Sequence, residues 1–311
     1  MRFRRSAALF AVALAAVGGL SACSSSSSSK KSIVVGSANF AESEIIAYMY
    51  VDALEAAGIK ATPKVNIGAR EVYQKALTNN EISVVPEYVS TVAEYWNTQI
   101  NGKDASTNSP VAGTDAAAVQ TKLAALVKSK GLVVGKPSPA ADENAFAVTK
   151  EFADKNGLKT LSDLSKLNGQ ITLGAGAECP TRPFCEPGLE KTYGLKFKGF
   201  KKFGSSGGVD TINALKDGTI QLGLVFSSSG LVAANNLVLL EDDKKLQQAD
   251  NIIWMGSAKK VDSKAQAVLD KVNAKMTTEA LQQLDKQVEI DHQSAAKAAQ
   301  KWIDDNGLGK K

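Results

Sequence analysis

One pattern of residues occurs twice in this chain, at a nearly constant offset. In each copy an apolar stretch ends at a small-residue turn, and a helix-like segment and two further short stretches follow. This is the order of a βαβ unit, which builds parallel sheets, so two similar α/β lobes are expected. The pairs 138 residues apart are Ile33 and Ile171, Gly36 and Gly174, Ala76-Leu77 and Ala214-Leu215, Ile82 and Ile220, and Tyr88 and Phe226, while Gly58 and Gly194, and Gly68 and Gly204, are 136 apart.

The remaining segments predict how the chain crosses between the lobes. Pro137-Ser138-Pro139-Ala140 has the composition of a first hinge, and the return is expected between Leu240 and Ile253. Lobe 1 would then hold residues 32–139 and 251–311, and lobe 2 residues 140–250. Residues 277–306 have the pattern of one or two polar-faced helices.

Ligands of open parallel sheets bind beyond the carboxyl ends of the strands. Tyr88 and Phe226 lie at those ends in the two copies, so we expect them to face each other across a cleft between the lobes. The alternative is that each ring belongs to the ordinary core of its lobe. Their equivalent places in the repeat favour a role in ligand binding.

The first thirty residues have the features of an export signal. A basic start is followed by an apolar stretch, residues 7–20, which is too short for a membrane-spanning helix. Leu20-Ser21-Ala22-Cys23 is similar to a bacterial lipobox, in which the cysteine takes a diacylglycerol. We expect residues 1–22 to be a signal peptide, Cys23 to carry the lipid, and the serine-rich residues 23–31 to be a tether. A plain secretory signal with a chance cysteine is the alternative.

Charge and composition argue against several classes of function. Lys and Arg total 37 against 32 Asp and Glu, and removal of Arg2, Arg4 and Arg5 with the signal would reduce the net charge from +5 to +2. This near balance argues against a nucleic-acid-binding protein. The single histidine, His292, excludes a His-based zinc site and disfavours a Ser–His–Asp triad. No metal and no cofactor are therefore expected.

An enzyme is the weaker interpretation of the acidic residues. The pairs Glu42 and Glu44, and Asp242 and Asp243, have no nucleophile or metal cluster beside them, so they are interpreted as solvated faces or turns. The glycine-rich residues 204–208 lack the lysine of a phosphate loop and are expected to form a loop before a helix.

Two cysteines remain in the exported part of the chain. Cys179 and Cys185 are close in sequence, with Pro180 and Pro183 between them. Exported proteins form disulfides, so a bond that shapes a local turn is expected. A metal site is the weaker interpretation, because no third cysteine or histidine lies nearby.

Five short segments, in order, resemble the substrate-binding proteins of osmoprotectant ABC transporters, which bind glycine betaine, choline, carnitine or related quaternary amines. The resemblance runs from about residue 32 to 307. It implies a two-lobed periplasmic-binding-protein fold (type II-like) that closes on its ligand by hinge motion. The segments are Gly36-Ser37-Ala38-Asn39-Phe40, Pro86-Glu87-Tyr88-Val89-Ser90-Thr91, Asn144-Ala145-Phe146-Ala147-Val148, Phe226-Ser227-Ser228 and Leu239-Leu240-Glu241-Asp242-Asp243-Lys244.

The resemblance also implies a set of ligand-binding residues. A trimethylammonium group donates no strong hydrogen bond, so an aromatic cage suits it. The cage positions of the family fall on Tyr88, Phe146, Phe226 and Asp250. The family position for the arginine that meets a ligand carboxylate falls on Arg182, a hydroxyl position on Thr91, and a polar position on Asn144.

This sequence departs from the family pattern at two of these positions. Asp250 stands where a tyrosine is usual, and Ala38 stands where the family has a lysine. Asp250 is a direct partner of the cation, an acceptor for a donor on a different ligand, or a solvent-exposed residue of a hinge loop. Loss of the lysine makes choline-like ligands as plausible as betaine, and a larger betaine such as ergothioneine is also open.

The predicted function is therefore that of a lipid-anchored, extracytoplasmic receptor, expected to be a monomer. It would deliver a quaternary ammonium compound to a membrane permease that an ATPase powers. The third hypothesis, after the receptor and the enzyme, is a receptor of the same fold for an anionic or amino-acid solute.

Overall fold

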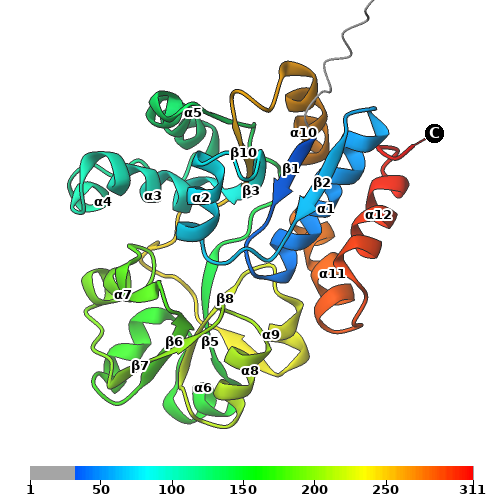
Figure 1. The fold of residues 1–311 in the computed structure, drawn as a ribbon. Coiled ribbons are helices and arrows are strands. Elements are labelled where there is room, and N and C mark those ends of the chain that lie inside the picture. Colours follow the sequence, from blue (N-terminus) through cyan, green and yellow to red (C-terminus); the bar gives the residue numbers. More distant parts are fainter. Residues whose placement is uncertain (1–31, 311) are drawn as a thin grey trace, which may run out of the picture. The chain divides into compact units, whose positions relative to one another are not determined.

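Two five-stranded sheets form the core of the computed structural model, which describes residues 32–310 (Figure 1). The strand orders are β2-β1-β3-β10-β4 and β7-β6-β8-β5-β9. The predicted signal peptide, Cys23 and the whole predicted tether, residues 23–31, lie outside the described residues. The first sheet contains the strands β1 (Ile33–Gly36), β2 (Ala61–Lys64), β3 (Val84–Tyr88), β4 (Leu132–Val134) and β10 (Ile252–Ser257), and the second contains β5 (Asn144–Thr149), β6 (Thr172–Gly176), β7 (Gly199–Phe203), β8 (Leu222–Phe226) and β9 (Leu237–Leu239).

The repeat in the sequence corresponds to the first three positions of each sheet. β1 runs parallel to β2 and β3, and β6 runs parallel to β7 and β8 in the same order. Only the fourth strand of each sheet departs from the expected parallel arrangement, because the fifth strand, β4 or β9, pairs antiparallel with the fourth and so runs in the direction of the first three. β10 pairs antiparallel with β3, starting opposite Tyr88, and β5 pairs antiparallel with β8, starting opposite Phe226. Because both crossing segments enter a sheet where the parallel strands end, the entering strand must run in the opposite direction.

Helices cover both faces of each sheet, so the strands are buried on both sides. In the first lobe α1, α10, α11 and α12 pack on one face, and α2, α3 and α5 on the other. Figure 1 shows α1 and α12 side by side, so the first and last helices of the described chain pack together. The helices are α1 (Ala41–Ala56), α2 (Arg70–Thr78), α3 (Val89–Asn101), α4 (Ala105–Asn108), α5 (Ala116–Val127), α6 (Lys150–Asn156), α7 (Glu186–Tyr193), α8 (Val209–Lys216), α9 (Gly230–Ala234), α10 (Ser263–Lys275), α11 (Thr278–Glu289) and α12 (Ala295–Asp305).

Local capping explains where several helices begin. The side chains of Asp115, Asp262 and Ser294 accept hydrogen bonds from backbone N–H groups in the first turns of α5, α10 and α12. The N-terminus of α3 has no cap of this kind in its own sequence, because its N-cap residue is Tyr88. As described below, it is capped from the distant hinge segment instead.

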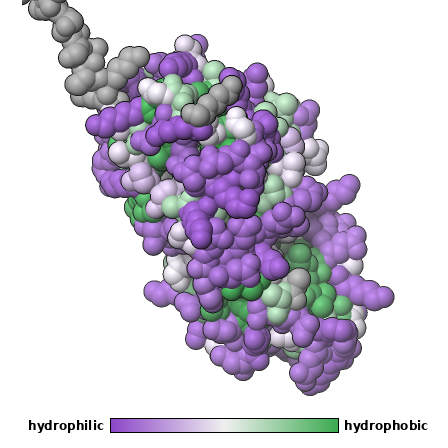
Figure 2. Space-filling model, turned by 90° about the vertical axis from the view of Figure 1, so that its right-hand side faces the viewer, coloured by the Kyte–Doolittle hydropathy of each residue, from purple (hydrophilic) through white to green (hydrophobic). Residues whose placement is uncertain are grey.

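Among residues 32–310 no helix combines the length and the apolar character that crossing a bilayer requires. Figure 2 shows a face that is mainly hydrophilic, with hydrophobic groups gathered in its lower half.

A repeated glycine and isoleucine explain part of the sequence symmetry. Gly36 on β1 leaves no room for a side chain, because a Cβ there would lie 2.6 Å from the Cδ1 atom of Ile82. Gly174 on β6 meets Ile220 in the same way. Both glycines have ordinary backbone angles, so the requirement is for close approach between the strand and the isoleucine. The pair recurs because each lobe packs the same unit in the same manner.

We predict that Gly36→Ala and Gly174→Ala each lower the free energy of unfolding by about 1–3 kcal/mol, the usual cost of overpacking a core. The measurement is urea denaturation. Gly199→Ala on β7 is the matched control, because no atom lies within 4 Å of a Cβ built there. Equal stabilities for all three variants would show that the isoleucines move aside freely.

Candidate functional site

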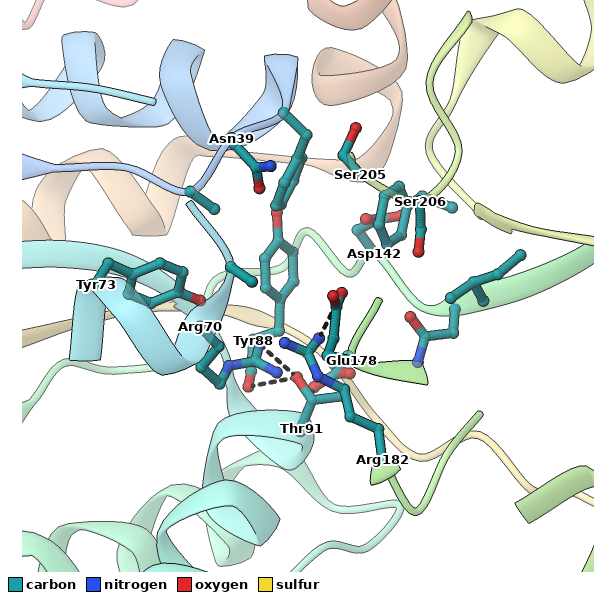
Figure 3. A pocket seen from close by; sticks show the side chains of 17 residues that line it. Asn39, Arg70, Tyr73, Tyr88, Thr91, Asp142, Glu178, Arg182, Ser205 and Ser206 are labelled. Atoms are coloured by element: carbon teal, nitrogen blue, oxygen red, sulfur yellow. Dashed lines mark hydrogen bonds and ion pairs between the residues drawn. The ribbon is translucent and has the colours of Figure 1, made fainter. Parts of the chain in front are cut away.

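A cavity of about 70 Å³ lies between the two lobes (Figure 3). First-lobe residues line it from the end of β1, the start of α2 and the junction of β3 with α3. The two crossing segments and the second lobe complete it. In Figure 3 Tyr88 stands near the centre, with Arg70, Thr91 and Arg182 around one end.

Six of the seven predicted ligand-binding residues line this cavity. They are Tyr88, Thr91, Asn144, Arg182, Phe226 and Asp250. The seventh, Phe146, does not, and the predicted place for it in the cage is corrected here. It shares a face of β5 with Asn144 but lies two residues further from the cleft, and it is 1% exposed in the apolar core of the second lobe.

A ring that the sequence analysis did not select completes the aromatic group. Phe40 lies between the two predicted rings. Its centroid is 5.2 Å from that of Phe226, in a stacked arrangement, and 6.1 Å from that of Tyr88. Phe40 comes from the turn after β1 and Phe226 from the end of β8, so this contact joins the lobes. Phe40 stands in one of the segments that carry the family resemblance, which was the available signal.

The hydroxyl of Tyr88 is not free in the cavity. It donates a hydrogen bond of 2.6 Å to Oε1 of Glu42, in the first turn of α1. Glu42 is only 4% exposed, so its interpretation as part of a solvated face was wrong. Burial and the neighbouring Glu42 carboxylate raise the pKa of Tyr88 well above its usual value. Tyr88 therefore stays uncharged, and its hydroxyl proton is used in the hydrogen bond to Glu42.

Arg70, also missed from the sequence, contributes a fixed positive charge. It is 7% exposed, and its Nε and Nη2 atoms donate to the carboxylate of Glu87 at 2.9–3.1 Å. Nη2 also donates to Oγ1 of Thr91 at 2.8 Å, and Gln74 donates to Glu87. Nη1 makes none of these bonds. Removal of either partner of such a buried pair is costly, about 3–5 kcal/mol, so Arg70 is held in place.

Asp250 lies in the cavity wall rather than in an exposed loop. It is 4% exposed, and its Oδ1 atom accepts hydrogen bonds from the backbone N–H groups of Ser90 and Thr91 at 2.8 and 3.0 Å. It thus caps α3, the helix that carries Thr91. Burial raises the pKa of Asp250 to about 8, against the effect of these N–H groups and of Arg70.

Arg182 is presented by a loop that a disulfide closes. Cys179 and Cys185 are bonded in the structure, and the loop contains a short 3-10 helix, Cys179–Thr181. The guanidinium lies 3.2 Å from Glu71 of α2 in the first lobe and 3.7 Å from Glu178. Arg182 is partly exposed, and its charge is met by one carboxylate across the cleft, that of Glu71, and by one from its own loop, that of Glu178.

The comparisons with known proteins identify the family. Residues 31–305 match the OpuAC family, described as the substrate-binding domain of the ABC-type glycine betaine transport system. The chain belongs to this family. It is 27% identical over 301 residues to the glycine betaine-binding protein YehZ of Escherichia coli (strain K12), covering 94% of this chain and 96% of that protein. It is 26% identical over 284 residues to the carnitine transport binding protein OpuCC of Listeria monocytogenes, covering 89% and 87%.

A solved structure supports the same fold. It is described as a glycine betaine/carnitine/choline ABC transporter, and it has a TM-score of 0.65 and 22% sequence identity to this chain, covering 89% of this chain and 99% of that one. At this identity the likeness concerns the fold alone. The predicted two-lobed α/β fold with a ligand cleft is confirmed, and the family makes this chain an extracytoplasmic substrate-binding protein of ABC transport.

The buried carboxyl groups around the cleft predict a pH-dependent stability. Burial raises the pKa of Asp250 to about 8 and that of Glu289 to about 7. Their ordinary values are about 4, so the folded state holds protons that the unfolded state releases. The free energy of unfolding should therefore fall as the pH rises from about 5 to about 8. Each such carboxyl contributes at most about 1.4 kcal/mol per pH unit.

Urea denaturation at several pH values measures this slope. The variant Glu289→Gln should flatten it, whereas Glu279→Gln, an exposed residue of the same helix, should leave it unchanged. A stability that rises over this range would contradict the assignment of protonated buried acids.

Proposed function

We propose that this protein captures a quaternary ammonium compound, such as glycine betaine or choline, in the cavity between its lobes. The observation that carries the proposal is the group of ring faces from Phe40, Tyr88 and Phe226, drawn from both lobes and lining one cavity. Ring faces attract a methylated cation that cannot donate hydrogen bonds, at about 0.5–2 kcal/mol for each contact.

The other end of the ligand would meet the basic side of the cavity. Arg182 is the partner proposed for a ligand carboxylate, because its pair with Glu71 is partly exposed and can be exchanged at low cost. Thr91 and the Nη1 atom of Arg70 lie on the same side. Asn144 completes the polar wall of the second lobe.

Two departures from the family pattern bear on the choice of ligand. Ala38 lines the cavity where the resemblance implies a lysine, and Asp250 lines it where a tyrosine is usual. The site therefore has one basic contact fewer and one acidic group more. We propose that choline is accepted as well as glycine betaine.

The cellular setting follows from the family and the amino-terminal sequence. We propose that residues 1–22 direct export, that Cys23 carries a lipid anchor, and that the monomeric receptor stands off the membrane on its serine tether. The loaded form would then meet a permease and its ATPase.

The replacement of Phe226 tests the aromatic contact. Phe226→Ala should weaken choline binding at least ~10-fold, and Phe226→Leu, which keeps most of the apolar bulk, should weaken it by a similar factor because the ring face is lost. Calorimetric titration measures both. The neutral isostere 3,3-dimethylbutan-1-ol is the ligand control and should bind more weakly than choline to the unchanged protein. Full affinity in both variants would remove Phe226 from the site.

The replacement of Arg182 tests the carboxylate contact. Arg182→Ala should weaken glycine betaine more than choline, because only betaine has a carboxylate for the two parallel hydrogen bonds of a guanidinium. Glu71→Gln is the matched control, since it breaks the same bridge between the lobes and keeps the arginine. Equal losses for the two ligands in Arg182→Ala would mean that Arg182 acts only on lobe closure.

The same titration decides between ligand classes. Carnitine, proline betaine, ergothioneine and several amino acids complete the panel. Saturable binding of an amino acid, with no binding of any quaternary amine, would replace the proposal by a receptor for another small solute on the same fold.

A further inference from the structure

A second cavity, lined by acids, adjoins the aromatic one. Its volume is about 210 Å³ against about 70 Å³, and Phe40, Phe226 and Asp142 line both. Its other walls come from the start of α1, the loop before α8, the turn after β8, and α11. The acids that line this acidic cavity are Glu42, Asp142, Asp285 and Glu289.

No basic side chain balances these four carboxyl groups. The lining residues, all within the described chain, include no lysine, arginine or histidine. The hydroxyl of Tyr88 meets one oxygen of Glu42, a backbone N–H of Ser228 meets Asp142 at 2.9 Å, and Ser229 lies 3.4 Å from Glu289. The hydroxyl of Ser227 also donates to Asp142, at 3.3 Å, so each of these three carboxyl groups accepts only one or two hydrogen bonds from the protein.

Two carboxylate oxygens in this cavity receive no N–H or O–H donor from the rest of the protein, and their carboxyl groups lie within hydrogen-bond reach of each other. They are Oε2 of Glu42 and Oδ1 of Asp285, on side chains that are 4% and 3% exposed. An unpaired buried carboxylate is costly, so the cavity requires either protons or a cation with donors. The described residues contain no cluster of His, Cys, Asp and Glu suited to a metal ion.

The carboxyl groups of the acidic cavity need N–H donors, which the trimethylammonium group proposed for the rings cannot supply. A trimethylammonium group has no N–H, whereas a protonated amine has three N–H donors around one positive charge. We propose that the acidic cavity is a second subsite of the cleft that takes a protonated amine. The ligand would be a dication, with a quaternary ammonium among the rings and a primary ammonium among the acids. This inference rests on the proposed function and extends it to a second class of ligand.

Burial of the acids gives the subsite a second property. Burial, followed by the mutual proximity of the carboxylates, raises the pKa values of Asp142 and Asp285, and burial raises that of Glu42. Without an amine, the cluster holds protons that an amine would displace. Amine binding should therefore release protons and should weaken as the pH falls.

Matched ligand pairs test the subsite. One member is an ω-aminoalkyl-trimethylammonium ion, from (2-aminoethyl)trimethylammonium upward in chain length, and the other has a methyl group in place of the ammonium. In calorimetry at about pH 8, at least one amino compound should bind roughly 10-fold or more tightly than its methyl counterpart, because hydrogen bonds to charged groups contribute about that much. Titration in buffers of different ionisation enthalpy should show proton release for that compound alone.

Variants of the acids that line the cavity test whether the preference for the amino compound arises there. Asp285→Asn and Glu289→Gln keep the shape and remove charge, so each should reduce the ratio of the paired affinities several-fold. Glu279→Gln, exposed on the same helix, should keep the ratio of the unchanged protein. Circular dichroism of each variant checks that it is folded.

The outcomes separate this inference from the proposed function. The methyl compounds and choline could bind while no amino compound binds more tightly than its methyl counterpart. The acids would then hold only protons, and the proposed amine subsite would be overturned. If the amino compound keeps its full affinity advantage in both Asp285→Asn and Glu289→Gln, the amine binds elsewhere and the proposed subsite is overturned as well. If no quaternary ammonium compound binds at all, the proposed function itself fails.

Discussion

The two segments that cross between the lobes are hydrogen-bonded to each other, and the geometry of the cleft depends on this contact. Ala141 and Asn251 form an isolated antiparallel bridge, and the N–H of Ile252 donates to the carbonyl of Ala140 at 3.0 Å. The N–H of Asp142 donates to the carbonyl of Asp250 at 3.2 Å. Two buried acids, one from each crossing, are thereby placed together where the sheets meet.

This paired crossing also fixes what each sheet presents to the cleft. β5 and β10 begin immediately after the crossings, opposite Phe226 and Tyr88. The carboxyl ends of the parallel strands are thus held near the pivot, where the lobes separate least during a hinge motion. Asp250 adds to this by capping α3 across the hinge, so the position of Thr91 depends on a residue 159 positions away.

The sequence predicted the features that recur and missed those that only tertiary contact creates. The repeat predicted two α/β units, and Tyr88 and Phe226 do line one cavity. The antiparallel direction of β5 and β10 was not predicted, because the repeat contains neither strand. Phe146 was misplaced because a pattern match does not say how far along a strand the cleft ends.

The acids illustrate the same limit. Glu42 and Glu44 are two residues apart in the sequence, which is typical of a solvated face. Glu42 is nevertheless buried, because Tyr88 from β3 and Asp285 from α11 meet it. Those two residues are 46 and 243 positions away, so periodicity within α1 could not indicate them. Arg70 was missed for the same reason, since its partner Glu87 lies on another element.

The stack of Phe40 on Phe226 limits how much of the affinity the rings alone can supply. The two rings stack on each other between the lobes. An aromatic pair of this kind contributes about 0.5–1.5 kcal/mol, and a desolvated cation on a ring contributes up to about 2 kcal/mol. A cation that contacts several rings gains more than the single ring contact that it replaces, so the rings still contribute to affinity. Interactions that arise only with the ligand, such as those of its charged end, add to the shift of the lobes toward the loaded state. The rings therefore favour a methylated cation, and the charged groups around them select among the ligands that carry one.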